Sequence, residues 1–122
     1  MIKMNFCVRK RDDISEEEFH DYWLNKHGPL VKSHRESLCV KKYTQSHAGF
    51  TELDESVTSQ RGMKTGYDGL AELWWENVDT LQSALETKDG RQAGAELLED
   101  EARFIDLAKS TIFFSEEHVI FE

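Results

Sequence analysis

The order in which strand-like and helix-like hydrophobic patterns follow one another is the feature that most constrains the fold of this chain. The first segment, residues 2–9, alternates strictly between apolar and more polar side chains, which is typical of a strand with one buried face. Apolar residues at helical spacing come next, and further segments of strand-like alternation and of helical spacing follow along the chain. In chain order, we expect a strand at 2–9, a helix at 15–27, a short helix at 29–34, strands at 38–47 and 67–75, helices at 77–85 and 90–108, and a strand at 109–120.

This strand-helix-strand-strand-helix-strand order predicts an α+β fold of the ferredoxin-like kind. A third strand fills the gap between two strands that a helix joins, which makes one four-stranded antiparallel sheet with helices on one face. The length of 122 residues favours a single domain that spans residues 1–122. Trp74 and Trp75 are neighbours on one strand, so their side chains point to opposite faces. A large aromatic on each face predicts that both faces are covered, and hence that the chain forms a homodimer.

Short-range signals mark the ends of the first helix and a long connection. Ser15 and Glu18 have the spacing of a capping box, in which each side chain hydrogen-bonds the backbone amide of the other residue. We expect Gly28 and Pro29 to end this helix, because glycine tolerates the left-handed conformation found there and proline cannot continue the backbone ladder. The segment 48–66 is polar, contains three glycines and lacks periodicity, which predicts a long loop that forms a mobile flap or crosses to the partner subunit.

The charge of the chain excludes several classes of partner. Its 24 acidic side chains outnumber 15 basic ones, and the net charge is −9. A field of this sign repels nucleic acid backbones and anionic membranes, so we expect neither nucleic acid nor a membrane as a partner. The acidic run at 99–101 is interpreted as a solvated helix face.

The cysteines and the short motifs limit the chemistry further. Cys7 and Cys39 lie on strands that are not neighbours in this topology, so we expect two reduced thiols in a cytoplasmic protein. We expect no secretion leader and no membrane span, because the chain opens on a strand-like pattern and holds no apolar run of the necessary length. The sequence has no nucleotide-binding glycine pattern, no Ser/His/Asp order and no metal-ligand spacing, so no metal or other cofactor is expected. A single axial histidine would suffice for haem, which leaves a haem site open.

One segment resembles the signature of the EthD family. Residues 19–31, Phe-His-Asp-Tyr-Trp-Leu-Asn-Lys-His-Gly-Pro-Leu-Val, match the family pattern of Phe-x-x-Tyr-Trp, three residues, and His-Gly-Pro-Leu. Segment 67–74 resembles the third strand of the family, and segment 100–107, with its continuation at 116–120, resembles the C-terminal half. The resemblance implies a dimeric α+β barrel, in which two ferredoxin-like sheets pack face to face and each subunit has a cavity between its sheet and its helices.

The resemblance implies less about the reaction. EthD was named for a role in ethyl tert-butyl ether degradation, fungal relatives are described as dehydratases of polyketide pathways, and the wider superfamily includes polyketide cyclases, cofactor-free monooxygenases and haem-handling proteins. The fold does not choose among these activities. Our leading hypothesis is a cofactor-independent lyase, of the dehydratase or cyclase type, that acts on an apolar or aromatic polyketide-like molecule by general acid/base chemistry. The alternative is a non-catalytic protein that binds a small molecule beside a catabolic oxidation system.

His27 is the candidate catalytic residue. It lies four residues after Trp23 and eight after Phe19, on the stripe that faces the sheet, and it occupies the histidine position of the resembled signature. Imidazole titrates near neutrality, so it can take a proton from carbon or give one to a departing hydroxyl. The alternative is that His27 hydrogen-bonds carbonyls at the end of its helix and only shapes the following turn.

Aromatic and polar residues on two elements are candidates for binding the substrate. Tyr22 and Trp23, on the first helix, either line the cavity or belong to the plain core. Tyr43 and His47 share one face of the second strand, and either side chain could hydrogen-bond a substrate oxygen. A histidine at a strand end is also commonly just solvated.

The third strand carries two more candidates, Glu72 and Trp74, on one of its faces. If that face meets the helices, Trp74 lines the cavity and Glu72 forms an acid/base pair with His27. If it meets the partner subunit, both residues belong to the interface. The sequence leaves this choice open.

Overall fold

The structure is a computed structural model that describes residues 1–64 and 66–122. Its four strands form one antiparallel sheet in the order β2-β3-β1-β4, which confirms the predicted ferredoxin-like topology. The elements are β1 (Ile2–Val8), α1 (Glu16–Tyr22), η1 (Trp23–His27), α2 (Gly28–Ser33), β2 (Lys42–His47), α3 (Thr51–Ser59), β3 (Gly69–Trp75), α4 (Val78–Glu86), α5 (Lys88–Glu101), η2 (Leu107–Lys109) and β4 (Thr111–Glu116).

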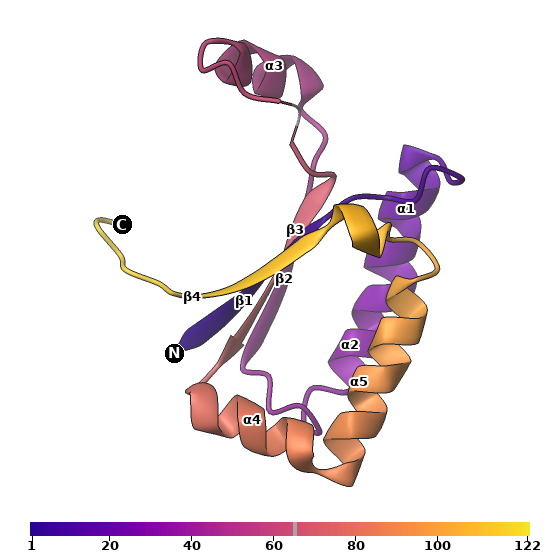
Figure 1. Cartoon of the computed structure of the whole chain (residues 1–122), viewed down its shortest axis with the longest axis vertical. Coiled ribbons are helices and arrows are strands. Elements are labelled where there is room, and N and C mark those ends of the chain that lie inside the picture. The colour runs from indigo at the N-terminus through magenta and orange to yellow at the C-terminus, as the bar shows by residue number, and fades with distance from the viewer. Residues whose placement is uncertain (65) are drawn as a thin grey trace.

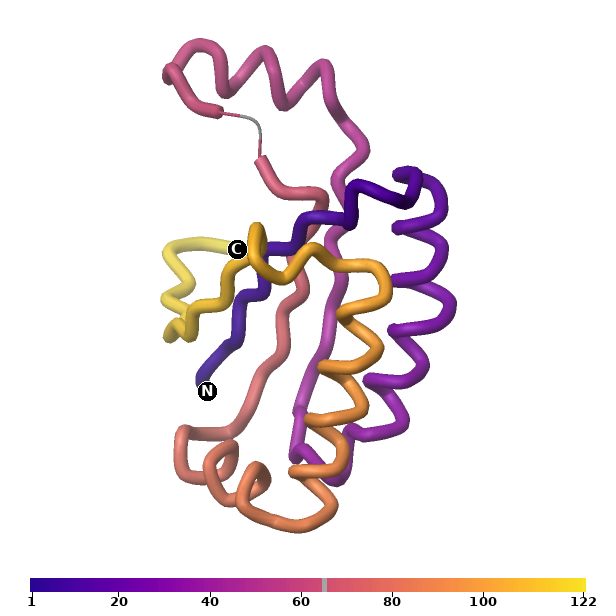
Figure 2. The backbone as a smooth tube through the Cα atoms, turned by 45° about the vertical axis from the view of Figure 1, so that its right-hand side comes forward, coloured from indigo at the N-terminus to yellow at the C-terminus, as the bar shows by residue number. Residues whose placement is uncertain are grey.

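The molecule has two layers. Helices α1, α2 and α5 lie side by side along one face of the sheet, and α4 lies at one end of it (Figures 1 and 2). In the described part of the chain, no helix covers the opposite face of the sheet. None of the described helices is both long and apolar enough to cross a membrane.

The hydrophobic core lies between the two layers. Alternate residues of β1 and β3 point toward the helices, among them Phe6, Leu73 and Trp75, and all three are buried. They pack against Phe19 and Trp23 from α1 and η1. Strand alternation, which the sequence already showed, therefore decides which side chains enter the core.

Two of the predicted helix starts, at Ser15 and Asn77, are confirmed at atomic detail. Glu18 donates its backbone amide to Ser15 Oγ at 3.1 Å, and the Ser15 amide donates to Glu18 Oε1 at 3.3 Å. Asn77 Oδ1 accepts from the Thr80 amide at 2.8 Å at the start of α4. These bonds satisfy amides that the first turn of a helix leaves without partners.

The first helix does not end at Gly28 and Pro29, contrary to the prediction. A π-helical turn, η1, joins α1 to α2, and Gly28 has right-handed helical angles of φ −53° and ψ −53°. The Gly28 amide donates to the Trp23 carbonyl, and this wider turn accommodates Pro29, which has no N–H to donate. A β-carbon at position 28 would lie 3.3 Å from Gln45 Nε2, so glycine serves close packing here.

The second and fourth strands, β2 and β4, are much shorter than predicted. Cys39 has a φ of 57°, a left-handed angle that a strand cannot contain, and β2 begins only at Lys42. Strand β4 ends at Glu116, which pairs with Ile2, the first residue of β1, so later residues find no strand to pair with. Both cysteines are free thiols.

The segment 48–66 contains a helix, α3, where the sequence predicted only a loop. In Figures 1 and 2 this helix projects beyond the end of the sheet, away from the other helices. None of its residues is buried, and Leu53 and Val57, four residues apart, are both exposed. Their spacing is a weak helical signal, and the absence of core contacts explains why no longer periodicity accompanies it.

Candidate functional site

A cavity of about 200 Å³ lies between the sheet and the helices. Its wall is mostly apolar, and Phe6, Leu73 and Trp75 of the sheet contribute to it. Three ionisable side chains, His27, Tyr43 and Glu101, line the same wall. An apolar pocket with a few polar groups is the usual form of a small-molecule site.

His27 is held by Asp100 at the wall of this cavity. The two side chains are each 7% exposed, and His27 Nδ1 lies 2.7 Å from Asp100 Oδ2. A carboxylate can only accept a hydrogen bond, so Nδ1 carries the ring hydrogen and donates a hydrogen bond to Asp100. None of the described residues hydrogen-bonds Nε2. The unshared electron pair of Nε2 is therefore left for a ligand.

Asp100 lies at the centre of a small polar cluster. Tyr22 Oη donates to Asp100 Oδ1 at 2.5 Å, and Arg103 Nη1 donates to the same oxygen at 3.1 Å. Burial alone would raise the pKa of Asp100, but the hydrogen bonds from Tyr22, His27 and Arg103 outweigh it and lower the pKa. Asp100 is therefore a carboxylate at neutral pH.

His27 and Glu101, which both line the cavity, have opposite pKa shifts. Burial lowers the pKa of His27, although the hydrogen bond and charge of Asp100 oppose the change. Burial, together with the charge of Asp100, raises the pKa of Glu101 to about 7. At neutral pH the imidazole is thus a base, while part of the Glu101 population still carries its proton. Ionisable pairs with diverging pKa values are typical of acid/base sites.

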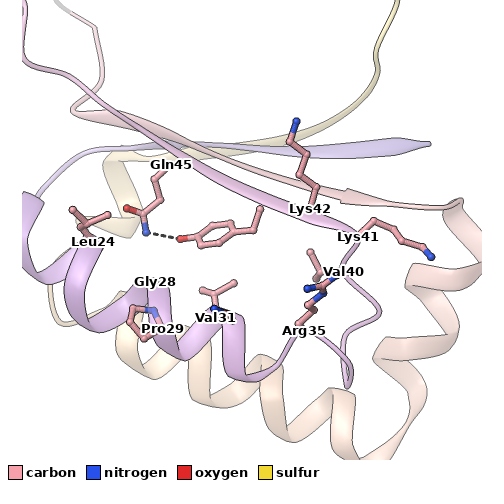
Figure 3. A pocket seen from close by; sticks show the side chains of 11 residues that line it. Leu24, Gly28, Pro29, Val31, Arg35, Val40, Lys41, Lys42 and Gln45 are labelled. Carbon is pink, nitrogen blue, oxygen red and sulfur yellow. Dashed lines mark hydrogen bonds between the residues drawn. The ribbon is translucent and has the colours of Figure 1, made fainter.

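A second, wider hollow of about 640 Å³ adjoins the cavity at the edge strand β2. It shares Val31 and Tyr43 with the inner cavity. In Figure 3, Gln45 reaches from β2 toward Gly28 on the helix across this hollow. Its remaining wall carries four cationic side chains, Lys32, Arg35, Lys41 and Lys42.

The structure brings some of the predicted substrate-binding residues together with His27. Trp23 and Tyr43 line the inner cavity beside it. Tyr22 instead lies behind His27, where it holds Asp100. His47 lies on the same face of β2 as Tyr43 but stacks against the Trp23 ring, with ring centroids 4.3 Å apart.

Glu72 and Trp74 lie on the opposite face of the sheet, away from the cavity. Glu72 forms an ion pair of 2.7 Å with Lys3, and the ammonium groups of Lys3 and Lys42 lie 5.3 and 4.7 Å from the Trp74 ring. This placement corrects the expectation that they contact a substrate beside His27. The reason is strand alternation, since their neighbours Leu73 and Trp75 point toward the helices.

The sequence interpretation missed Asp100 and Glu101, which it assigned to a solvated acidic run. Asp100 is 5% exposed and lies on the buried stripe of α5 with Ala93 and Leu97. A spacing of four and then three residues along this stripe is the signal that could have identified it. Among the described residues, no group of three or more His, Cys, Asp or Glu side chains could hold a metal ion.

Comparisons with known proteins agree with this fold. The model of the EthD domain matches residues 11–108. Among solved structures, an EthD family protein from Bacillus halodurans is 18% identical over 97% of this chain and 99% of its own, with a TM-score of 0.63. An EthD-like protein from Ralstonia eutropha is 20% identical over 98% and 94%, with a TM-score of 0.62. A dimeric protein of unknown function and ferredoxin-like fold from Bacteroides fragilis is 13% identical over 95% of each chain, with a TM-score of 0.57.

These relatives share the architecture of the chain, and the family match covers the elements that carry His27 and Asp100. The sequence matches no curated protein. The match to the family model spans most of the chain, from before α1 into η2, and confirms the resemblance seen in residues 19–31. The chain belongs to the EthD domain family.

Proposed function

We propose that this EthD-family protein is a cofactor-independent lyase, of the dehydratase or cyclase type, that acts on a small apolar or aromatic, polyketide-like molecule. One observation carries the proposal, namely that Asp100 binds His27 Nδ1 at 2.7 Å while Nε2 has no partner among the described residues. A neutral imidazole held in this way is a positioned general base. Dehydration breaks a C–O bond and aldol-type cyclisation forms a C–C bond, and both are promoted by proton transfer without net oxidation or reduction, so they need no redox cofactor.

Each member of the cluster has a distinct task in this proposal. Asp100 fixes the tautomer and the orientation of His27, and its charge stabilises the imidazolium that forms when Nε2 takes a proton. Tyr22 and Arg103 hold Asp100 in place. Glu101, with a pKa of about 7, supplies a proton to a leaving hydroxyl or returns one to carbon. The apolar wall excludes water from these transfers.

The alternative, a non-catalytic binding protein, predicts different hydrogen-bond partners for His27. In that case His27 is expected to hydrogen-bond backbone carbonyls at a helix end. Its partner is instead a buried carboxylate, and a second ionisable group lines the same cavity. Both observations favour an enzyme. A cavity of about 200 Å³ is also too small for a porphyrin ring, which argues against haem as its occupant.

The same proposal includes a homodimer that forms through the uncovered face of the sheet. The chain exposes 8517 Å², about 1,700 Å² more than a compact monomer of its mass. A standard interface takes about 800 Å² from each partner, so the excess is enough for one. Phe113 on this face and Ile120 and Phe121 in the C-terminal segment are 52%, 86% and 88% exposed.

A nitrobenzisoxazole tests the base without knowledge of the natural substrate. This neutral bicyclic compound opens to a coloured phenolate when a base removes its only reactive C–H proton. We expect the protein to accelerate the opening, with a rate that rises with pH through a midpoint below 6.5, because only the unprotonated Nε2 can act. His27→Gln is expected to lower the rate by about 10²–10⁴-fold, because glutamine cannot carry the proton.

His118→Gln is the matched control, since His118 is an exposed histidine in the C-terminal segment. The His118→Gln variant should open the nitrobenzisoxazole ring at the same rate as the unchanged protein. Circular dichroism establishes that both variants are folded. Equal rates for His27→Gln, His118→Gln and the unchanged protein would show that His27 is not the base.

A further inference from the structure

A row of hydrogen-bonded side chains runs along the helix-facing side of β2. Tyr43, Gln45 and His47 alternate along the strand and therefore share this side. Gln45 Nε2 lies 2.7 Å from Tyr43 Oη, Gln45 Oε1 lies 2.7 Å from His47 Nε2, and His47 Nδ1 lies 2.7 Å from His20 Nδ1. The row begins at His20 on α1 and ends at Tyr43 in the wall of the cavity.

The direction of every bond in this row is determined by one backbone group. Gln45 Nε2 also lies 2.9 Å from the Trp23 carbonyl oxygen, which can only accept. This contact identifies the amide nitrogen, so Gln45 donates to Tyr43 Oη and its oxygen accepts from His47 Nε2. His47 Nδ1 then accepts from His20.

These bond directions leave the hydroxyl hydrogen of Tyr43 free to bind a ligand. Tyr43 Oη already accepts from Gln45, so its own hydrogen points elsewhere, and no described residue accepts it. Burial, which is the largest influence, raises the pKa of Tyr43, so the hydroxyl keeps its hydrogen. Tyr43 is therefore an oriented hydrogen-bond donor without a protein partner, in the same cavity as the unpartnered Nε2 of His27.

A donor and a base in one small apolar cavity select a class of substrate. We propose that Tyr43 is a catalytic residue that donates a hydrogen bond to the carbonyl oxygen of a neutral β-hydroxy ketone, while His27 removes the proton from the carbon between the two oxygenated carbons. This inference rests on the proposed function and goes beyond it by naming the substrate class and a second catalytic group. Gln45, His47 and His20 are positioning residues, because they act through Tyr43.

The reaction balances without a further reactant. His27 Nε2 takes the α-proton, and the C–H electron pair forms an enolate whose oxygen Tyr43 stabilises. That pair then forms the C=C bond as the C–O bond of the β-hydroxyl breaks. The leaving oxygen takes the proton of Glu101 and departs as water, which leaves an α,β-unsaturated ketone. Transfer of the proton from the His27 imidazolium to the Glu101 carboxylate restores both groups.

Two probes separate this inference from the proposed function. The benzaldehyde–acetone aldol is a compact β-hydroxy ketone, and its dehydration gives a strongly absorbing enone. Benzylacetone has no hydroxyl to lose, and exchange of its α-protons in deuterium oxide, followed by proton NMR, measures enolisation alone. We expect the protein to accelerate both processes and to bind both ketones by quenching of tryptophan fluorescence. Nitrobenzisoxazole has no carbonyl and reports only on His27.

Tyr43→Phe is the decisive variant. Loss of one donor to a developing oxyanion lowers rates by about 10²–10³-fold, so we expect this loss with both ketones and a much smaller one with nitrobenzisoxazole. Tyr67→Phe is the matched control, because Tyr67 is 39% exposed and does not line the cavity, and it should leave all three rates unchanged.

Gln45→Glu tests the orientation of the Tyr43 hydroxyl hydrogen in a protein that still contains Tyr43. A glutamate oxygen accepts the hydroxyl hydrogen of Tyr43 and turns it away from the ligand, so the ketone rates should again fall by at least tenfold relative to the benzisoxazole rate. The inference is overturned if the ketones neither bind nor react while nitrobenzisoxazole does, or if Tyr43→Phe affects all probes equally. If nitrobenzisoxazole also reacts no faster than in buffer, the proposed function itself fails.

Discussion

The side chains of His27 and Asp100 meet at 2.7 Å although the two residues are 73 positions apart in the chain. His27 lies at the end of η1 and Asp100 near the end of α5, two elements that pack side by side on the sheet. Both side chains are buried at this contact. Two helices held by the core thus position the His27 imidazole and the carboxylate that orients it, and preorganisation of this kind needs no loop movement.

Replacement of the carboxylate by an amide tests this contact. Asp100→Asn keeps the shape of the side chain but removes the charge that favours the imidazolium of His27. We expect ring opening of nitrobenzisoxazole to slow by about 10²-fold or more. The midpoint of its pH profile should move further down, because Asp100 is the group that raises the pKa of His27 against burial. Glu99→Gln, at the exposed neighbouring position, should change neither quantity, and an unchanged Asp100→Asn profile would contradict the assignment.

The raised pKa of Glu101 predicts how stability depends on pH. Its value is about 7 in the folded protein against 4.5 in an exposed carboxyl, so its contribution is full below about pH 4.5 and is lost as the pH rises through about 7. Glu101→Gln removes this loss and should stabilise the protein at pH 8, by at most about 3 kcal/mol, but not at pH 4. Urea unfolding at both pH values measures the difference. Equal effects of Glu101→Gln at the two values would rule out a buried, proton-holding carboxyl.

A charged side chain introduced on the uncovered sheet face should weaken the homodimer, whereas one introduced on the outer face of the helices should not. Phe113→Glu places a carboxylate on the face that we assign to the homodimer, and its desolvation in an interface is costly. We expect this variant to sediment as a monomer at micromolar concentration while the unchanged protein sediments as a dimer. Leu98→Glu, at a position on α5 that is 56% exposed, should remain dimeric. Sedimentation of the unchanged protein as a monomer would refute the interface.

Helix α3 should be protected from hydrogen exchange only in the dimer. Its nine residues contain no buried side chain, and isolated helices of this length are unstable in water. We therefore expect the exposed Phe50, Leu53 and Val57 to pack against the partner subunit. Deuterium uptake by α3, measured at protein concentrations above and below dimer dissociation, should be slow in the dimer and fast in the monomer. Equally fast uptake in both would identify α3 as a mobile flap.

Local patterns predicted most of the fold. The alternation in Ile2–Val8 and the Ser15 capping box act within a few residues, and both have the predicted form in the structure. The Gly28-Pro29 pair misled the prediction, because the same two residues are compatible with a helix end and with a π-helical turn. In the folded protein the second form is present, and a β-carbon at Gly28 would lie 3.3 Å from Gln45 Nε2 of β2.

The sequence by itself determined the strand and helix order, the ferredoxin-like topology and His27 as the candidate base, because periodicity and family signatures are written in neighbouring residues. Only the tertiary structure decided that Glu72 and Trp74 face away from the cavity and that Asp100, Glu101 and an oriented Tyr43 share the surroundings of His27. Strand alternation separates the two faces of a sheet but does not say which face the helices cover. That choice, and every contact between η1 and α5, depends on how the distant elements pack around one core.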